Sequence, residues 1–162
     1  MADPVLKPVW RMGDVRAERD VLAFWREGKL LSQDVDLETR LKELCVVAYA
    51  GTRVVGVNTA VLQRLEEVRA RIAMLRLAVA RDFRQTYLAT EILGLARPLL
   101  ERWAAEHPEE KLMGIGCVVQ TREIQEKLFE ATWPRSGPAK RQVRLNEPPT
   151  RRPGTLQAGS EM

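Results

Sequence analysis

Two apolar segments, residues 72–79 and 111–120, flank a helical pattern, and this order constrains the fold more than any other feature of the sequence. Between them, large apolar residues recur at steps of four, three, four and four (Leu88, Ile92, Leu95, Leu99, Trp103). Such spacing places them on one face of an α-helix. A strand, a helix of about twenty residues and a second strand form a crossover, so the two strands are predicted to be parallel neighbours.

Pro98 falls inside this helical segment. We predict a kink there, because proline removes the hydrogen bond to the Gly94 carbonyl and its ring crowds the preceding turn.

A β-hairpin is predicted before this unit. Residues 45–50 (CVVAYA) indicate a strand, and Gly51-Thr52 supply a two-residue turn with glycine first, as a type II′ turn prefers. Residues 53–62 then alternate between two faces. The charged segment Gln63–Arg71 is predicted to be a loop or irregular extension. The nearly continuous apolar run of residues 72–79 indicates a central strand covered on both faces.

Two helices are predicted at the N-terminal side of the hairpin. The first spans Arg16–Glu27, where Val21 and Trp25 share an apolar stripe and Gly28 is placed to end the helix. The second is short and begins after Asp36, a favourable N-cap residue.

The C-terminal part of the chain divides into a helix and a tail. Residues 121–131 indicate another amphipathic helix, whereas five prolines and three glycines interrupt residues 134–162. We therefore predict one domain over residues 1–133 and a tail over residues 134–162 with at most one short strand, at Gln142–Asn146.

The net charge of +4 is concentrated in that tail. Residues 134–162 hold six basic and two acidic side chains, which accounts for the whole excess, and the rest of the chain is neutral. The predicted domain thus lacks the basic surface that nucleic-acid binding requires, and no nucleic-acid partner is expected.

Several classes of protein are disfavoured by composition. No apolar run approaches the roughly 20 residues that span a bilayer, and the N-terminus lacks the pattern of a secretory signal. Cys45 and Cys117 lie in apolar runs and are expected to be reduced core residues. Two cysteines and the single histidine, His107, do not supply a metal site at these spacings. A cytoplasmic protein without a metal is expected.

The segment Leu75–Thr90 is the best candidate for a functional site. A buried strand ends at Val79, a short polar loop follows, and a helix is predicted to begin at about Gln85. Free N–H groups and the positive end of the helix dipole would then converge where Arg84 adds a full charge. Such a junction favours a phosphate group, although an ordinary β–α junction with solvated basic residues remains the alternative.

These residues and their order resemble the GNAT N-acetyltransferases. In that superfamily the central strand ends in an apolar-x-Val and is followed by Arg/Gln-x-x-Gly-x-Gly/Ala, which holds the pyrophosphate of acetyl-CoA. Here Leu77-Ala78-Val79 matches the strand end, Arg84 the first residue of the motif and Ala89 its last. The order of helices, hairpin and crossover over residues 15–131 matches as well.

The resemblance implies a mixed, twisted α/β sheet with helices on both faces, and transfer of an acetyl group from acetyl-CoA to a primary amine. The backbone of Leu77 and Val79 would pair with the pantetheine arm, and the acyl group would sit near Val118 and Val119. The pyrophosphate would be held by a run of seven residues (Arg84, Gln85, Thr86, Tyr87, Leu88, Ala89, Thr90).

Three positions depart from the superfamily pattern. Tyr87 replaces the motif glycine, which normally leaves room for a close backbone approach. Phe129 stands where many members carry the tyrosine that protonates the CoA thiolate. Ala73 stands where some members carry a catalytic glutamate. A non-catalytic acyl-CoA-binding or interaction module on the same fold is therefore the alternative function.

Candidates for the acceptor side are less specific. Arg76 lies in an apolar strand, so its charge must be paired or open to a cleft, and both an acceptor-binding role and a structural salt bridge remain open. Phe24 and Trp25 lie on the first helix, which commonly lines the acceptor pocket in the superfamily, but a core role is the alternative. The amine itself is not indicated. Monomer and homodimer both remain open.

Overall fold

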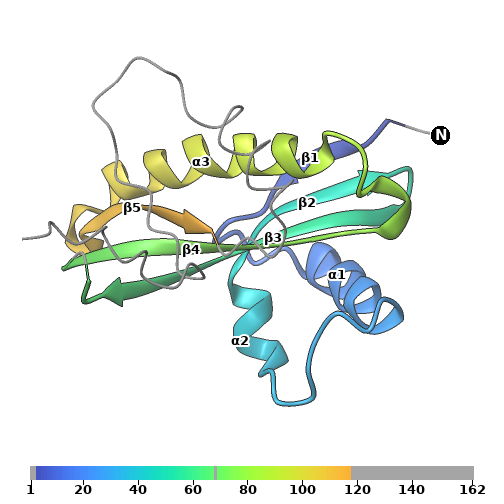
Figure 1. Cartoon of the computed structure of the whole chain (residues 1–162), viewed down its shortest axis with the longest axis horizontal. Coiled ribbons are helices and arrows are strands. Elements are labelled where there is room, and N and C mark those ends of the chain that lie inside the picture. Colours follow the sequence, from blue (N-terminus) through green and yellow to red (C-terminus); the bar gives the residue numbers. More distant parts are fainter. Residues whose placement is uncertain (1–2, 68, 118–162) are drawn as a thin grey trace, which may run out of the picture.

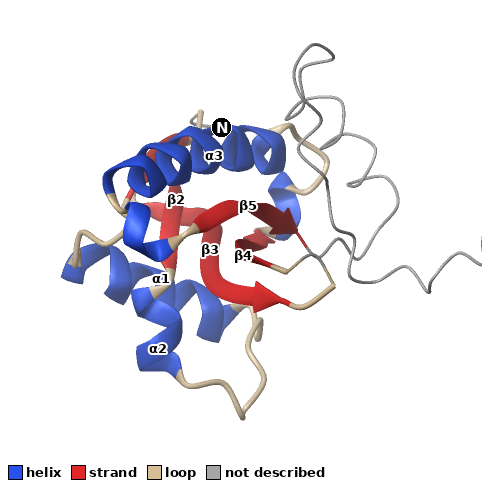
Figure 2. Cartoon of the chain, turned by 90° about the vertical axis from the view of Figure 1, so that its left-hand side faces the viewer, coloured by secondary structure: helices blue, strands red, loops and turns tan. Residues whose placement is uncertain are grey.

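Five strands form one mixed sheet in the order β1-β2-β3-β4-β5 in the computed structural model, which describes residues 3–67 and 69–117. The strands are β1 (Val5–Pro8), β2 (Leu44–Ala50), β3 (Arg53–Leu65), β4 (Ala70–Val79) and β5 (Leu112–Cys117). The helices are α1 (Val15–Glu27), α2 (Leu37–Lys42) and α3 (Leu88–Glu106), with short 3₁₀ turns η1 (Arg81–Phe83) and η2 (Pro108–Glu110). In Figures 1 and 2, α3 covers one face of the twisted sheet and α1 and α2 lie on the other. This is the predicted α/β architecture.

The predicted hairpin is confirmed. β2 and β3 are antiparallel, Ala50 pairs with Arg53, and Gly51 between them adopts a positive φ of 61°. Glycine reaches that conformation without steric cost, which explains why the turn falls at this residue.

The predicted crossover is also confirmed. β4 and β5 are parallel, with Ala73 opposite Ile115 and Leu75 opposite Cys117, and α3 connects them. Pro98 lies at an exposed position inside α3, and the helix continues through it to Glu106.

The predicted loop at Gln63–Arg71 is largely wrong. β3 extends to Leu65 and β4 starts at Ala70, so residues at both ends of the predicted loop belong to strands. The strands continue because Leu65 and Ile72 are buried in a small apolar cluster with Met74, while charged neighbours such as Arg64 point to solvent. The alternation of the strand thus persists within a segment whose composition is polar.

β1 was not predicted. It pairs antiparallel with β2 at the edge of the sheet, from Val5 opposite Tyr49 to Pro8 opposite Val46. Its four residues bury one face only partly, and Pro8 at the end of an edge strand needs no ladder donor. A segment this short carries too little alternation to distinguish it from a loop.

The core has two layers, one on each side of the sheet. On one side, α3 packs buried residues such as Ile92 and Leu100 against Val46 and Val55. On the other, Val21 of α1 joins a second cluster with strand residues. Gly56 allows α3 its close approach, because a Cβ at this position would lie 2.6 Å from Ile92 Cδ1.

Some predictions lie outside the described residues: the helix at 121–131, the strand at Gln142–Asn146, the positions of Val118, Val119 and Phe129, and the domain boundary at residue 133. Within the described part, none of the helices has the length and apolar character needed to cross a membrane.

Candidate functional site

The end of β4 directs alternate backbone groups to opposite edges of the strand. The Ala80 amide donates to Val55 O on β3 at 2.8 Å, and Arg76 O accepts from Asn58 Nδ2, also on β3, at 3.0 Å. Even-numbered residues therefore face β3, and the peptide groups of Leu77 and Val79 face the opposite edge, toward β5. The described pairing with β5 ends at Leu75 opposite Cys117. Leu77 and Val79 thus lie beyond the last described strand pair.

Arg84 folds back on this strand end. Its Nε donates to Val79 O at 3.2 Å, which fixes the guanidinium beside the end of β4 while the side chain stays exposed. The guanidinium retains further N–H groups, which are directed in a planar fork suited to an anion.

The helix begins three residues later than predicted, at Leu88 rather than at about Gln85. Phe83 is buried in the core at the end of η1, which draws the chain inward. Thr86 Oγ1 then donates to Phe83 O at 2.6 Å and accepts from the Leu88 amide at 3.3 Å. This compact turn replaces the first helical turn that composition alone suggested.

Tyr87 does not occupy the conformation that would demand glycine. Its φ is −80° and ψ is 6°, values open to any residue, and its side chain is 73% exposed. The amides of Ala89 and Thr90, in the first turn of α3, have no intrahelical acceptor by the geometry of a helix. Tyr87 therefore needs no glycine-like backbone conformation, and its side chain is not packed into the core.

A bidentate ion pair stabilises the loop. Arg53, at the start of β3, donates to Asp82 in η1 at 2.8 and 3.1 Å. The Arg53 guanidinium lowers the pKa of Asp82, which keeps this carboxyl ionised and engaged. The carboxylate nearest in sequence to Arg84 is thus held by another arginine.

A cavity of about 530 Å³ adjoins the junction between the end of β4, the β2–β3 turn and α1. Val79 and Arg84 form one wall, and Phe24 and Glu27 of α1 form another. Of the two predicted acceptor-side aromatic residues, Phe24 therefore borders a cavity, whereas Trp25 is buried in the core cluster under α1.

Arg76 is 46% exposed and forms an ion pair with Glu43, with Arg76 Nη1 and Glu43 Oε2 at 3.5 Å. Glu43 and the buried pair Asn58 and Thr59 were not singled out by sequence reasoning. Two adjacent polar residues within an otherwise apolar strand segment are a signal that could have identified Asn58 and Thr59, whereas no such signal marks Glu43. His107 ends α3, where its ring stacks on Trp103 with centroids 4.7 Å apart.

Comparison of folds places the molecule in a known structural class. It is similar to AAC(6')-Iy in complex with the bisubstrate analogue CoA-S-monomethyl-acetylneamine, with a TM-score of 0.52 and 14% identity over 91% of this chain and 99% of the other. Glucosamine-6-phosphate N-acetyltransferase from Arabidopsis thaliana gives a TM-score of 0.50 at 7% identity, over 85% and 95% of the two chains. A GNAT-family acetyltransferase from Streptococcus pneumoniae gives a TM-score of 0.49 at 13% identity, over 79% of this chain and 82% of the other.

The chain therefore has the GNAT fold, as the sequence resemblance predicted. Identities of 7 and 14% establish a common fold and nothing finer. The sequence alone matches no protein-family profile and no curated relative.

Proposed function

We propose that this chain is a GNAT-superfamily N-acetyltransferase that transfers an acetyl group from acetyl-CoA to a primary amine. The observation that carries the proposal is the junction of β4 and α3, where an exposed arginine, a helix N-terminus and outward-facing strand peptides meet. The shared fold with an acetyltransferase bound to a CoA bisubstrate analogue supports acyl-CoA as the donor.

In this proposal the pyrophosphate lies against Arg84 and the amides of the first turn of α3, where positive charge and free donors coincide. The pantetheine arm pairs with the peptide groups of Leu77 and Val79, which face the edge away from β3. The neutral amine attacks the thioester carbonyl, a C–N bond forms, the C–S bond breaks, and the ammonium proton passes to the thiolate or to water. Holding donor and acceptor together supplies much of the acceleration.

An acyl-CoA-binding or interaction module without turnover is the second candidate. Ala73 is fully buried in the core beneath α3. Because it is an alanine, this position of β4 carries no ionisable group. Phe129, the other departure from the usual acid–base pattern, offers no proton.

Binding and turnover separate the two candidates. Acetyl-CoA should raise the melting temperature, because a ligand that binds only the native state stabilises it by mass action. Free thiol should then be released on addition of a suitable amine from a panel of polyamines, aminoglycosides, amino acids and peptides, and not in the absence of an amine. Binding without amine-dependent release throughout the panel would favour the module. Absence of acetyl-CoA binding would contradict both.

A further inference from the structure

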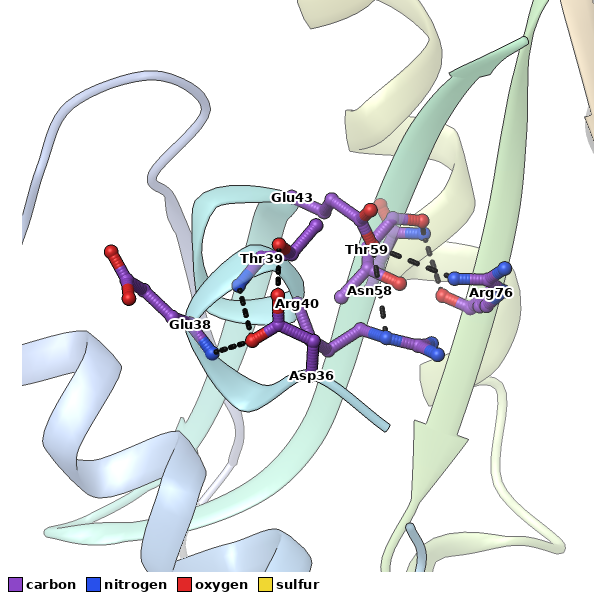
Figure 3. A network of polar contacts seen from close by, with 8 residues as sticks. All are labelled: Asp36, Glu38, Thr39, Arg40, Glu43, Asn58, Thr59 and Arg76. Carbon is purple, nitrogen blue, oxygen red and sulfur yellow. Dashed lines mark hydrogen bonds and ion pairs between the residues drawn. The ribbon is translucent and has the colours of Figure 1, made fainter. Parts of the chain in front are cut away.

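A polar cluster lies on the face of the sheet opposite α3, beside the proposed donor site. It consists of Arg40 and Glu43 at the end of α2, Thr59 on β3 and Arg76 on β4 (Figure 3). Glu43 Oε2 lies 3.7 Å from Arg40 Nε and 3.5 Å from Arg76 Nη1. One carboxylate is thus shared by two guanidinium groups, and the cluster keeps one positive charge in excess.

That excess charge is held where water is scarce. The side chains of Arg40 and Glu43 are only 18% and 19% exposed. Burial, followed by the charge of Arg76, lowers the pKa of Arg40, and the charge of Glu43 does not fully offset the two. Binding a second anion therefore stabilises a partly buried cation that lies beside a like charge more than it would stabilise a fully solvated cation.

The contacts within the cluster are also incomplete. Charge-assisted hydrogen bonds of an arginine are usually about 2.7–2.9 Å long, and Arg53 reaches 2.8 and 3.1 Å with Asp82 in this same protein. Both ion pairs of Glu43 are longer than that. Thr59, directly opposite Arg76 in the strand register, is 3% exposed, and its hydroxyl has no hydrogen-bond partner among the described residues.

The backbone of Arg76 is held in place by a buried side chain. Asn58, which is fully buried, donates through Nδ2 to Arg76 O at 3.0 Å and to Thr59 O at 3.2 Å, which ties the two strands together at this point. Arg76 immediately follows Leu75, the last residue of β4 described as paired with β5, and immediately precedes Leu77. A group bound at Arg76 would therefore lie within a few residues of the proposed donor site.

We propose that the Arg40–Glu43–Arg76 cluster binds a carboxylate of the acceptor, so that the acceptor is an amine of the amino-acid or peptide type. That the bound carboxylate belongs to the acceptor rests on the proposed function. A single excess positive charge matches a carboxylate better than a phosphate dianion. The exposed Arg76 guanidinium receives the carboxylate, Arg40 contributes long-range attraction, and the Thr59 hydroxyl gains a partner when the cluster rearranges around it.

The kinetic test compares leucine with leucinamide as acceptors for acetyl-CoA. The amide has the less protonated amine at neutral pH, so a preference for the acid runs against intrinsic reactivity. We expect a lower KM for leucine, and Arg76→Gln should raise that KM by about tenfold or more, because a hydrogen-bonded charge pair is lost. The KM for acetyl-CoA should not change, and the KM for leucinamide should rise much less than the KM for leucine. Arg64→Gln, which removes a charge from an exposed ion pair on β3, is the matched control.

The binding test needs no acetyl-CoA and separates this inference from the proposed function. N-acetyl-leucine should bind the wild-type protein in calorimetry and bind at least about tenfold more weakly to Arg76→Gln, with partial recovery in Arg76→Lys. Glu43→Gln removes the competing carboxylate and should tighten binding, whereas a purely structural salt bridge predicts no gain. O-phosphoethanolamine, an amine with a phosphate, should bind more weakly than N-acetyl-leucine.

Failure of the two proposals looks different. If N-acetyl-leucine binds in an Arg76-dependent manner but no amine is acetylated, the carboxylate site stands and the proposed function fails. If amines are acetylated but leucine and leucinamide are equivalent, or Arg76→Gln affects both alike, the carboxylate site is overturned and the proposed function stands. Tighter binding of the phosphate probe would overturn the assignment of a carboxylate.

Discussion

Arg84 illustrates how one residue serves both the fold and the proposed site. Through Nε it donates to Val79 O at the end of β4, and the side chain as a whole remains exposed. Asp82, two residues earlier, is engaged by Arg53 and does not neutralise it by a direct ion pair. The local charge available to an anion is therefore positive.

The first prediction tests this residue. Arg84→Glu places a negative charge against the pyrophosphate, so acetyl-CoA should no longer raise the melting temperature, while the unliganded protein unfolds much as before. Arg102→Glu makes the same charge change near the far end of α3 and should preserve the shift. Equal thermal shifts in Arg84→Glu and wild type would refute the phosphate site.

The second prediction concerns Cys45, whose burial raises the pKa of its thiol to about 12. In the unfolded chain the pKa of this thiol is about 8.5. The stability that the folded state gains from burying the neutral thiol is therefore complete below that pH and is lost as the pH rises toward 12. Cys45→Ala lacks this contribution. The difference in unfolding free energy between wild type and variant should be constant up to pH 8, then narrow by about 1.4 kcal/mol per pH unit.

Urea unfolding at pH 7, 8, 9 and 10 measures this difference. Other titrating groups cancel between the two proteins, because they are common to both. A difference that stays constant through pH 10 would contradict the burial of this thiol.

At the scale of elements, the sequence predicts those parts of the fold whose pattern is long or whose turn needs a special residue. The hairpin follows from alternation and from Gly51, and the parallel pair follows from two apolar runs around a long helical stripe. β1 is only four residues long. At the C-terminal end of β3, charged residues make the alternation of apolar and polar positions difficult to recognise. Both were missed because the signal is spread over too few apolar residues.

The candidate site was predicted less completely than the fold. The position of Arg84 at the junction follows from a sequence motif. The start of α3 does not, because Phe83 is buried in the core and the helix begins only at Leu88. No local sequence pattern indicates which residue of a loop will be buried. The cluster around Arg76 was harder still. Glu43 and Arg76 are 33 residues apart in sequence, and only the register of β2, β3 and β4 brings them together.

The third prediction tests the contact between α3 and the sheet. Gly56→Ala introduces a methyl group 2.6 Å from the fully buried Ile92 Cδ1 and should reduce the unfolding free energy by about 1–3 kcal/mol. Ile92→Val removes that Cδ1, so the double variant should lose less than the sum of the two single variants.

Gly94→Ala is the matched control for this pair, because a methyl group added there, on the exposed side of α3, would have nothing within 4 Å of it. It should stabilise the protein by about 0.5–1 kcal/mol, since alanine favours a helix more than glycine does. Additive effects of Gly56→Ala and Ile92→Val in denaturant unfolding would contradict the close packing.

The whole molecule combines the GNAT fold with side chains that depart from the motifs of the superfamily it resembles. Tyr87 proves compatible with the loop conformation, because its backbone is ordinary and its ring is exposed. Ala73 is part of the core, and its position offers no acid or base. Catalysis by this chain would then depend on positioning the two substrates and polarising the thioester carbonyl.

The last prediction concerns Phe129, which by the sequence resemblance stands where many superfamily members carry a tyrosine that acts as general acid. A positioned acid or base typically contributes about 10²–10⁴-fold, so a chain with Phe129 in place of the usual tyrosine should turn over slowly. Phe129→Tyr should increase kcat for release of free CoA while leaving the KM for acetyl-CoA unchanged, because a new hydroxyl would act on the departing sulfur and not on binding. Phe83→Tyr, at a buried aromatic residue just before Arg84, controls for an added hydroxyl elsewhere and should not raise kcat. If acetyl-CoA binds but Phe129→Tyr gives no increase with any active amine, Phe129 does not occupy the position of the general acid.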